Sequence, residues 1–110
     1  MLNLSRGTGV QNIQGTSSCA PRGSAGTWKQ FYTQRTGFWP SCCCIFRCGN
    51  GATGGAHVRI SGQHGVWIIP MCSEHNSAYN FGWMVVDEGT IAVRVDERYS
   101  SGPSGVCFGS

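Results

Sequence analysis

The stretch that decides the fold is Trp67-Ile-Ile-Pro-Met-Cys72-Ser-Glu-His75-Asn76, in which an apolar run leads directly into a cysteine and a histidine. A short apolar run of this kind predicts a buried strand, here over residues 66–69. A short helix is then expected to open at Cys72 and to run toward Asn80. Cys72 and His75 would share one face of its first turn, and Glu74 suits the positive N-terminal end of a helix.

A second pair of candidate metal ligands lies upstream of this stretch. Cys43 or Cys44 forms a short chelating turn with Cys48, and the residues from Cys48 to Cys72 are enough for one β-hairpin. Zinc prefers four tetrahedral sulfur and nitrogen ligands, and two chelating turns can supply two each. The sequence therefore predicts one zinc ion bound by Cys43 (or Cys44), Cys48, Cys72 and His75. The order of knuckle, hairpin and ligand-bearing helix is that of a treble clef.

Three motifs carry a family resemblance: Cys43-x4-Cys48-Gly-Asn, Gly55-Ala-His57-Val and the stretch from Trp67 to Asn76. Together they resemble treble-clef zinc proteins of the HNH type, and also a set of small uncharacterised proteins with a G-A-H-V…W-I-I-P-x-C-x-x-H-N pattern. The resemblance spans about residues 38–80. It implies a metal-dependent nuclease in which His57 acts as the general base toward water and Asn76 lies near a second, catalytic metal.

The same resemblance exposes a departure from the nuclease pattern. Ala56 stands where these nucleases commonly place a metal-binding Asp, and no carboxylate precedes Glu74 in the chain. A hard cation would therefore have almost no oxygen ligands. The alternative roles for His57 are a buried histidine hydrogen-bonded to backbone and a zinc ligand that replaces one thiol. We therefore predict a non-catalytic zinc module and keep the HNH-like nuclease as the alternative.

The cysteines permit a different interpretation. The chain has seven cysteines, an odd number that cannot pair completely within one molecule. Disulfide pairing alone would indicate a secreted, disulfide-stabilised defence or interaction protein. A mixture is also open, in which pairs form among Cys19, Cys42 or Cys44, and Cys107 while zinc takes four other ligands.

The rest of the chain divides into three parts. Residues 1–27 are rich in Gly, Ser, Thr and Gln and predict an irregular N-terminal arm. Residues 28–99 form the expected zinc-binding domain and residues 100–110 a C-terminal tail. Within the domain we expect an amphipathic helix over residues 27–36 that ends at Gly37. Four strands are expected as two hairpins: 56–60 with 66–69, and 83–86 with 91–95. The predicted class is a small α+β domain with one or two short helices and long loops.

Charge is distributed unevenly along the chain. Residues 1–73 contain no Asp or Glu, and their six basic residues are Arg6, Arg22, Lys29, Arg35, Arg47 and Arg59. All five acidic residues lie in residues 74–110. This asymmetry favours an anionic partner such as nucleic acid for the first part. The alternative is that these cations, which do not cluster in the sequence, are simply solvated.

Length and composition limit the remaining possibilities. With 110 residues the chain can form one domain with a modest core. No apolar run approaches the ~20 residues of a transmembrane helix, so no membrane partner is expected. No signal peptide is visible at the start, which favours a cytoplasmic over a secreted protein. The partner and the oligomeric state are left open by the sequence.

Overall fold

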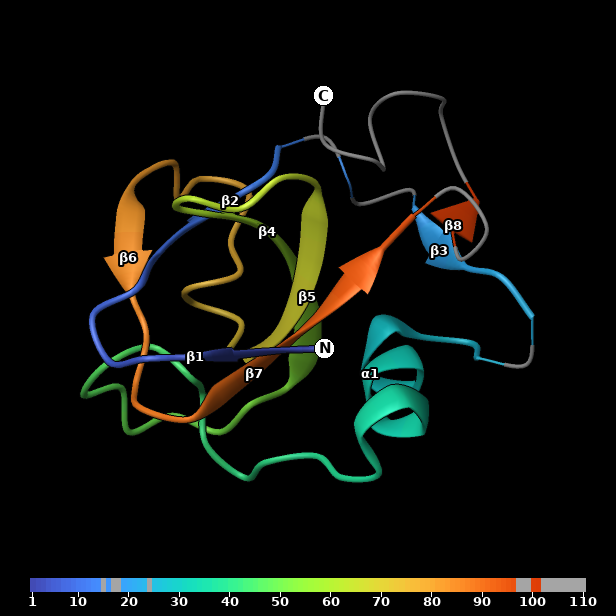
Figure 1. Ribbon diagram of the computed structural model, residues 1–110, viewed down its shortest axis with the longest axis horizontal. Coiled ribbons are helices and arrows are strands. Elements are labelled where there is room, and N and C mark those ends of the chain that lie inside the picture. The colour runs from blue at the N-terminus through green and yellow to red at the C-terminus, as the bar shows by residue number, and fades with distance from the viewer. Residues whose placement is uncertain (15, 17–18, 24, 97–99, 102–110) are drawn as a thin grey trace.

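A curled, six-stranded antiparallel sheet carries one helix in the computed structural model (Figure 1). The structure describes residues 1–96 except 15, 17–18 and 24, together with residues 100–101. In chain order the elements are β1 (Leu2–Leu4), β2 (Gly9–Asn12), β3 (Ala20–Pro21), α1 (Trp28–Thr36), β4 (Gly54–Ile60), β5 (Val66–Met71), β6 (Trp83–Val85), β7 (Thr90–Val95) and β8 (Ser100–Ser101). The large sheet has the order β1-β7-β5-β4-β2-β6, and β3 pairs with β8 in a second, two-stranded sheet. The expected α+β class is confirmed.

The hairpin β4–β5 lies at the centre of the sheet and has an apolar core on each face. Because side chains alternate along a strand, Ala56, Val58 and Ile60 enter one core cluster. His57 lies on the opposite face, opposite Ile68 of β5, which belongs to the second cluster beneath α1. This first hairpin agrees with the sequence prediction.

Helix α1 begins and ends where local chemistry predicts. The Thr27 side chain accepts from the Gln30 backbone, and the Gln30 side chain accepts from the Thr27 backbone, which completes a capping box. Gly37 ends the helix in the left-handed conformation at φ 83°. Gly55 of β4 lets the helix approach closely, since a Cβ there would lie 2.9 Å from the Trp28 carbonyl carbon.

The predicted second hairpin is wrong. Residues 83–85 form β6, which pairs with β2 at the edge of the sheet, whereas β7 lies between β5 and β1. Strand β7 is buried at most positions, so it gains more apolar contact between two neighbours than it would in an isolated hairpin. The local alternation of residues 83–95 predicted the strands but not their partners.

The helix expected from Cys72 toward Asn80 is also wrong, because the segment forms successive turns. One helix-like bond forms, from the Asn76 N–H to the Cys72 carbonyl at 3.0 Å. The next turn would need the Tyr79 N–H to donate to the His75 carbonyl. That carbonyl instead accepts from the side-chain amides of Asn12 and Asn80, and the Tyr79 N–H donates to Ser77 Oγ.

Residues 1–27 are more regular than their composition predicts, because β1 and β2 are integral strands of the sheet. Of the expected C-terminal tail, only residues 100–101 are described, as β8, and residues 102–110 lie outside the described part. Within the part of the chain that the structure describes, no helix is long and apolar enough to cross a membrane.

Candidate metal centre

The first half of the candidate metal centre is a loop that follows α1. Its backbone is folded by a bond from the Cys43 N–H to the Asn50 carbonyl and one from the Cys48 N–H to the Ile45 carbonyl, both 2.9 Å. Arg47 has a positive φ of 62°, which turns the chain sharply just before Cys48. These bonds turn the thiols of Cys43 and Cys48 toward the same side of the loop.

The second half follows β5 directly. Cys72 is the first residue after the strand, and the turn that begins there brings the His75 ring back beside it. The His75 N–H lies 3.5 Å from Cys72 Sγ. The His75 carbonyl accepts from Asn12 Nδ2 at 2.6 Å and from Asn80 Nδ2 at 2.8 Å, so the sheet holds this turn in place.

Cys43, Cys48, Cys72 and His75 lie close enough together to hold a metal ion, with all four ligand atoms within 4.8 Å of one another. Cys48 Sγ and Cys72 Sγ are 3.8 Å apart. His75 Nδ1 lies 3.8 Å from Cys43 Sγ and 3.2 Å from Cys72 Sγ. Tetrahedral zinc with ordinary bond lengths separates two sulfurs by about 3.8 Å, and a sulfur from a nitrogen by about 3.6 Å. The two separations of 3.8 Å are close to these values, so the group is consistent with a zinc site.

The thiols of this group differ in their tendency to ionise. Burial opposes ionisation of Cys72, but hydrogen bonds from the His75 backbone and side chain and from the neighbouring thiols outweigh it and lower its pKa. Burial raises the pKa of Cys43, and the adjacent Cys72 thiolate raises it further. Asn50 Nδ2 also approaches Cys72 Sγ, at 3.9 Å, and is a polar neighbour that the ligand pattern does not identify by itself.

The remaining cysteines are separate from this group. Cys44 packs in the first core cluster, where burial raises the pKa of its thiol. Of the two cysteines that the sequence left open, Cys43 is therefore the one that lies in the candidate metal group. Cys42 is exposed and free. Cys19 is disulfide-bonded, whereas the expectation for Cys107 lies outside the described residues. A disulfide and a set of free, clustered thiols thus occur in one chain, as the mixed interpretation allows.

His57 lies outside the metal group, on the face of β4 that α1 covers. The residue is only 6% exposed. Its ring packs edge-on against Trp28 at 4.5 Å between centroids, and Nε2 has no hydrogen-bond partner among the described residues. Burial lowers its pKa from 6.5 to about 4. His57 is thus buried as the alternative interpretation expected, but without the predicted side-chain bond to backbone at Nε2.

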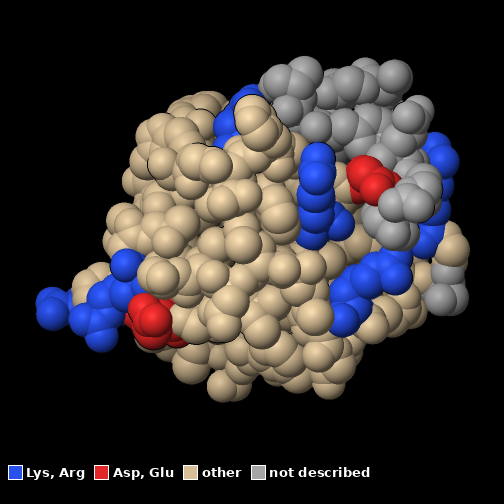
Figure 2. Space-filling model, viewed as in Figure 1, with Lys and Arg blue, Asp and Glu red and all other residues tan. Residues whose placement is uncertain are grey.

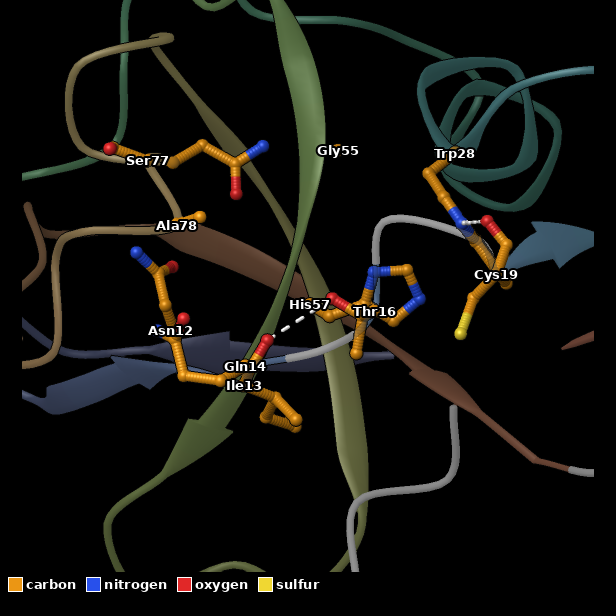
Figure 3. A pocket seen from close by; sticks show the side chains of 11 residues that line it. Asn12, Ile13, Gln14, Thr16, Cys19, Trp28, Gly55, His57, Ser77 and Ala78 are labelled. Atoms are coloured by element: carbon orange, nitrogen blue, oxygen red, sulfur yellow. Dashed lines mark hydrogen bonds between the residues drawn. The ribbon is translucent and has the colours of Figure 1, made fainter. Parts of the chain in front are cut away.

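His57 and Asn76 line the same cavity of about 280 Å³ (Figure 3). In Figure 3 the β4 residues Gly55 and His57 lie between Trp28 on one side and Ser77 and Ala78 on the other. The described residues that line this cavity include no Asp or Glu. A hard cation at these described walls would therefore lack the carboxylates it prefers.

The depressed pKa of His57 predicts a specific loss of stability in acid. His57 takes up its proton near pH 6.5 in the unfolded chain and only near pH 4 in the folded chain. The free energy of unfolding therefore falls as the pH drops from 6.5 to 4. Between pH 7 and pH 5 we expect a loss of about 2 kcal/mol. The measurement is urea unfolding of the wild type and His57→Gln at both pH values.

The candidate metal ligands also become protonated in acid, and they do so in both proteins. The difference between the two pH dependences therefore isolates His57. Equal losses in the two proteins would show that the imidazole ionises in the folded state near its ordinary pKa.

No family model, no curated protein and no solved structure matches this chain.

Proposed function

We propose that this protein is a small, non-catalytic zinc-binding module in which the metal joins the loop around Cys43 and Cys48 to the turn after β5. The observation that supports the proposal is the convergence of four ligand atoms from these two segments within 4.8 Å. Three thiols and one imidazole are donors that suit zinc, whereas calcium and magnesium prefer oxygen. The β4–β5 hairpin between the two ligand pairs also follows the order of a treble clef, with a turn in place of its helix.

A structural role is favoured over a catalytic one by the number of protein ligands. Catalytic zinc keeps one position open for water or substrate, whereas structural zinc takes four protein ligands. Here Cys43, Cys48, Cys72 and His75 would fill the tetrahedron. The HNH-like alternative would also need a second metal beside His57, and the described walls of that cavity offer no carboxylate.

The chain offers a matched test of the ligand set, because Cys42 is free and exposed beside Cys43 but outside the group. Elemental analysis of the purified wild type is expected to give one zinc per chain. Cys72→Ser is expected to lose most of it, because one strong thiolate ligand is removed, while Cys42→Ser keeps it. A wild type that is folded without metal, or a Cys72→Ser variant that retains full zinc, would contradict the proposal.

A further inference from the structure

The turn of residues 72–76, which carries Cys72 and His75, is called the metal turn. The most exposed aromatic residues in the described part of the chain follow it. Tyr79 is 88% exposed, Phe81 63% and Trp83 56%. Aromatic side chains cost free energy when they stay in water, and a cluster of them on a surface marks an interaction site. The two core clusters leave these three side chains out, so their size is not explained by packing within the fold.

The backbone that carries these aromatics is fixed to the sheet. Gln11 Nε2 of β2 donates to the Phe81 carbonyl at 3.0 Å. The side-chain amide of Asn80 donates to the His75 carbonyl at 2.8 Å, and β6 then pairs Trp83 with Gln11. The exposed segment is thus held between the metal turn and the sheet edge. Such an arrangement lowers the entropy cost of binding a partner.

The Trp83 ring lies across β2 at Gly9. A Cβ on Gly9 would lie 3.4 Å from Trp83 Cε3 and 3.8 Å from Trp83 Cζ3. The absent side chain of Gly9 therefore leaves room for the benzene ring of the indole to rest on the strand. With 56% of the residue exposed, the indole forms a supported platform for stacking.

A hollow of about 430 Å³ lies beside this platform and is lined by polar and basic groups. Its walls include Arg59, His64 and Trp83, together with the turn of residues 61–65. The strands β4, β2 and β6 are paired in register at Arg59, Gln11 and Trp83. Two strand spacings place the Cα of Arg59 about 10 Å from the Cα of Trp83. The Arg94 guanidinium borders the same turn, with Nε 3.0 Å from where a Cβ on Gly65 would lie. No carboxylate occurs among the described lining residues.

We propose that this hollow binds a nucleotide unit, with the base stacked on Trp83 and the phosphate at Arg59. A planar ring uses the exposed indole face, and an anionic group uses the guanidinium of Arg59 in the wall of the hollow. Basic side chains gather at the left and right edges of the face shown in Figure 2, and the Arg6 and Arg47 guanidiniums both lie over the Phe46 ring. The described lining of the hollow itself holds one arginine and no lysine. The hollow therefore offers few phosphate contacts, which suits a free nucleotide or a short single strand better than duplex DNA, which requires a continuous basic stripe. The proposal goes beyond the zinc-binding function and does not depend on which metal is bound.

The test is fluorescence anisotropy with a labelled, mixed-sequence 12-nucleotide DNA single strand at low salt, with AMP as the competitor and a DNA duplex for comparison. The wild type is expected to bind the single strand more tightly than the duplex. Trp83→Ala is expected to weaken binding roughly 5- to 150-fold, the range for loss of one stacked base. Arg59→Ala is expected to reduce the salt slope by about 0.7, the value for one phosphate on a single strand.

Two matched variants separate the site from general surface effects. Phe38→Ala removes another aromatic side chain, on a residue that is 42% exposed. Arg6→Ala removes a cation at the turn before β2. Both variants are expected to bind like the wild type.

Competition by AMP would assign the site to the single nucleotide, and its absence would assign it to the strand. Wild type that binds neither probe, or Trp83→Ala that binds equally well, would overturn the proposal. Self-association that Trp83→Ala abolishes, without oligonucleotide binding, would overturn it in favour of a second copy of the chain. Zinc content, measured on each variant, reports separately on the metal centre.

Discussion

Removal of the metal with a strong chelator is expected to unfold most of this chain. Structural zinc contributes about 10 kcal/mol or more of apparent binding free energy in small modules, whereas domains of ordinary size have a net stability of about 5–15 kcal/mol. The long irregular segment between α1 and β4 contributes Cys43 and Cys48. Without metal, its attachment to the turn at Cys72 would rest on a few hydrogen bonds.

The loss should be measured by far-ultraviolet circular dichroism and by amide NMR spectra before chelation, after it, and after zinc is restored. The expected result is a collapsed amide dispersion that zinc recovers. Cys42→Ser, whose mutated side chain is free and exposed, should behave like the wild type at every step. A chelated protein that keeps its dispersed spectrum would show that the sheet and the Cys19 disulfide maintain the fold without metal.

Local signals predicted the elements that depend on neighbours in sequence. Thr27 and Gly37 marked the ends of α1, and the strand patterns of residues 56–60 and 66–69 marked the central hairpin. The ligand group was also predictable, because each chelating turn is short. Local signals could not decide between Cys43 and Cys44. The Cys44 N–H donates to the distant Pro70 carbonyl at 3.1 Å, and this bond turns Cys44 toward the core.

Features that depend on distant partners were missed. Strand β2 is short and polar in composition, and only its place between β4 and β6 makes it a strand. Asn12 lies 63 positions from His75 in sequence, so no spacing links it to the metal turn. Its side-chain amide nevertheless donates to the His75 carbonyl, the acceptor that the next turn of a helix would need. Side-chain competition for backbone acceptors is therefore why the close approach of the four candidate ligands was predicted correctly while the helix was not.

Trp28→Ala is expected to cost about 3–5 kcal/mol, the range for truncating a buried large aromatic. Trp28 is 9% exposed, and its indole N–H donates to the Cys19 carbonyl at 3.1 Å. Its ring packs edge-on against both His57 and Phe31. The substitution therefore opens a gap between α1 and β4 and leaves a buried carbonyl without its donor, two effects that add.

The same substitution has a second expected result at His57. The pKa of this imidazole is lowered to about 4 because burial keeps water from the charged form. When the indole is removed, water enters beside the ring, so the pKa should rise toward 6.5. The measurements are urea unfolding at pH 7 and an NMR titration of the His57 ring. Trp83→Ala, which removes an indole that is 56% exposed, should change stability by about 1 kcal/mol or less and leave that titration unchanged. If the pKa of His57 stays near 4 in Trp28→Ala, the desolvation arises from Ile68 and the other β5 neighbours rather than from the indole, and the packing of α1 against β4 would not control the ionisation of His57.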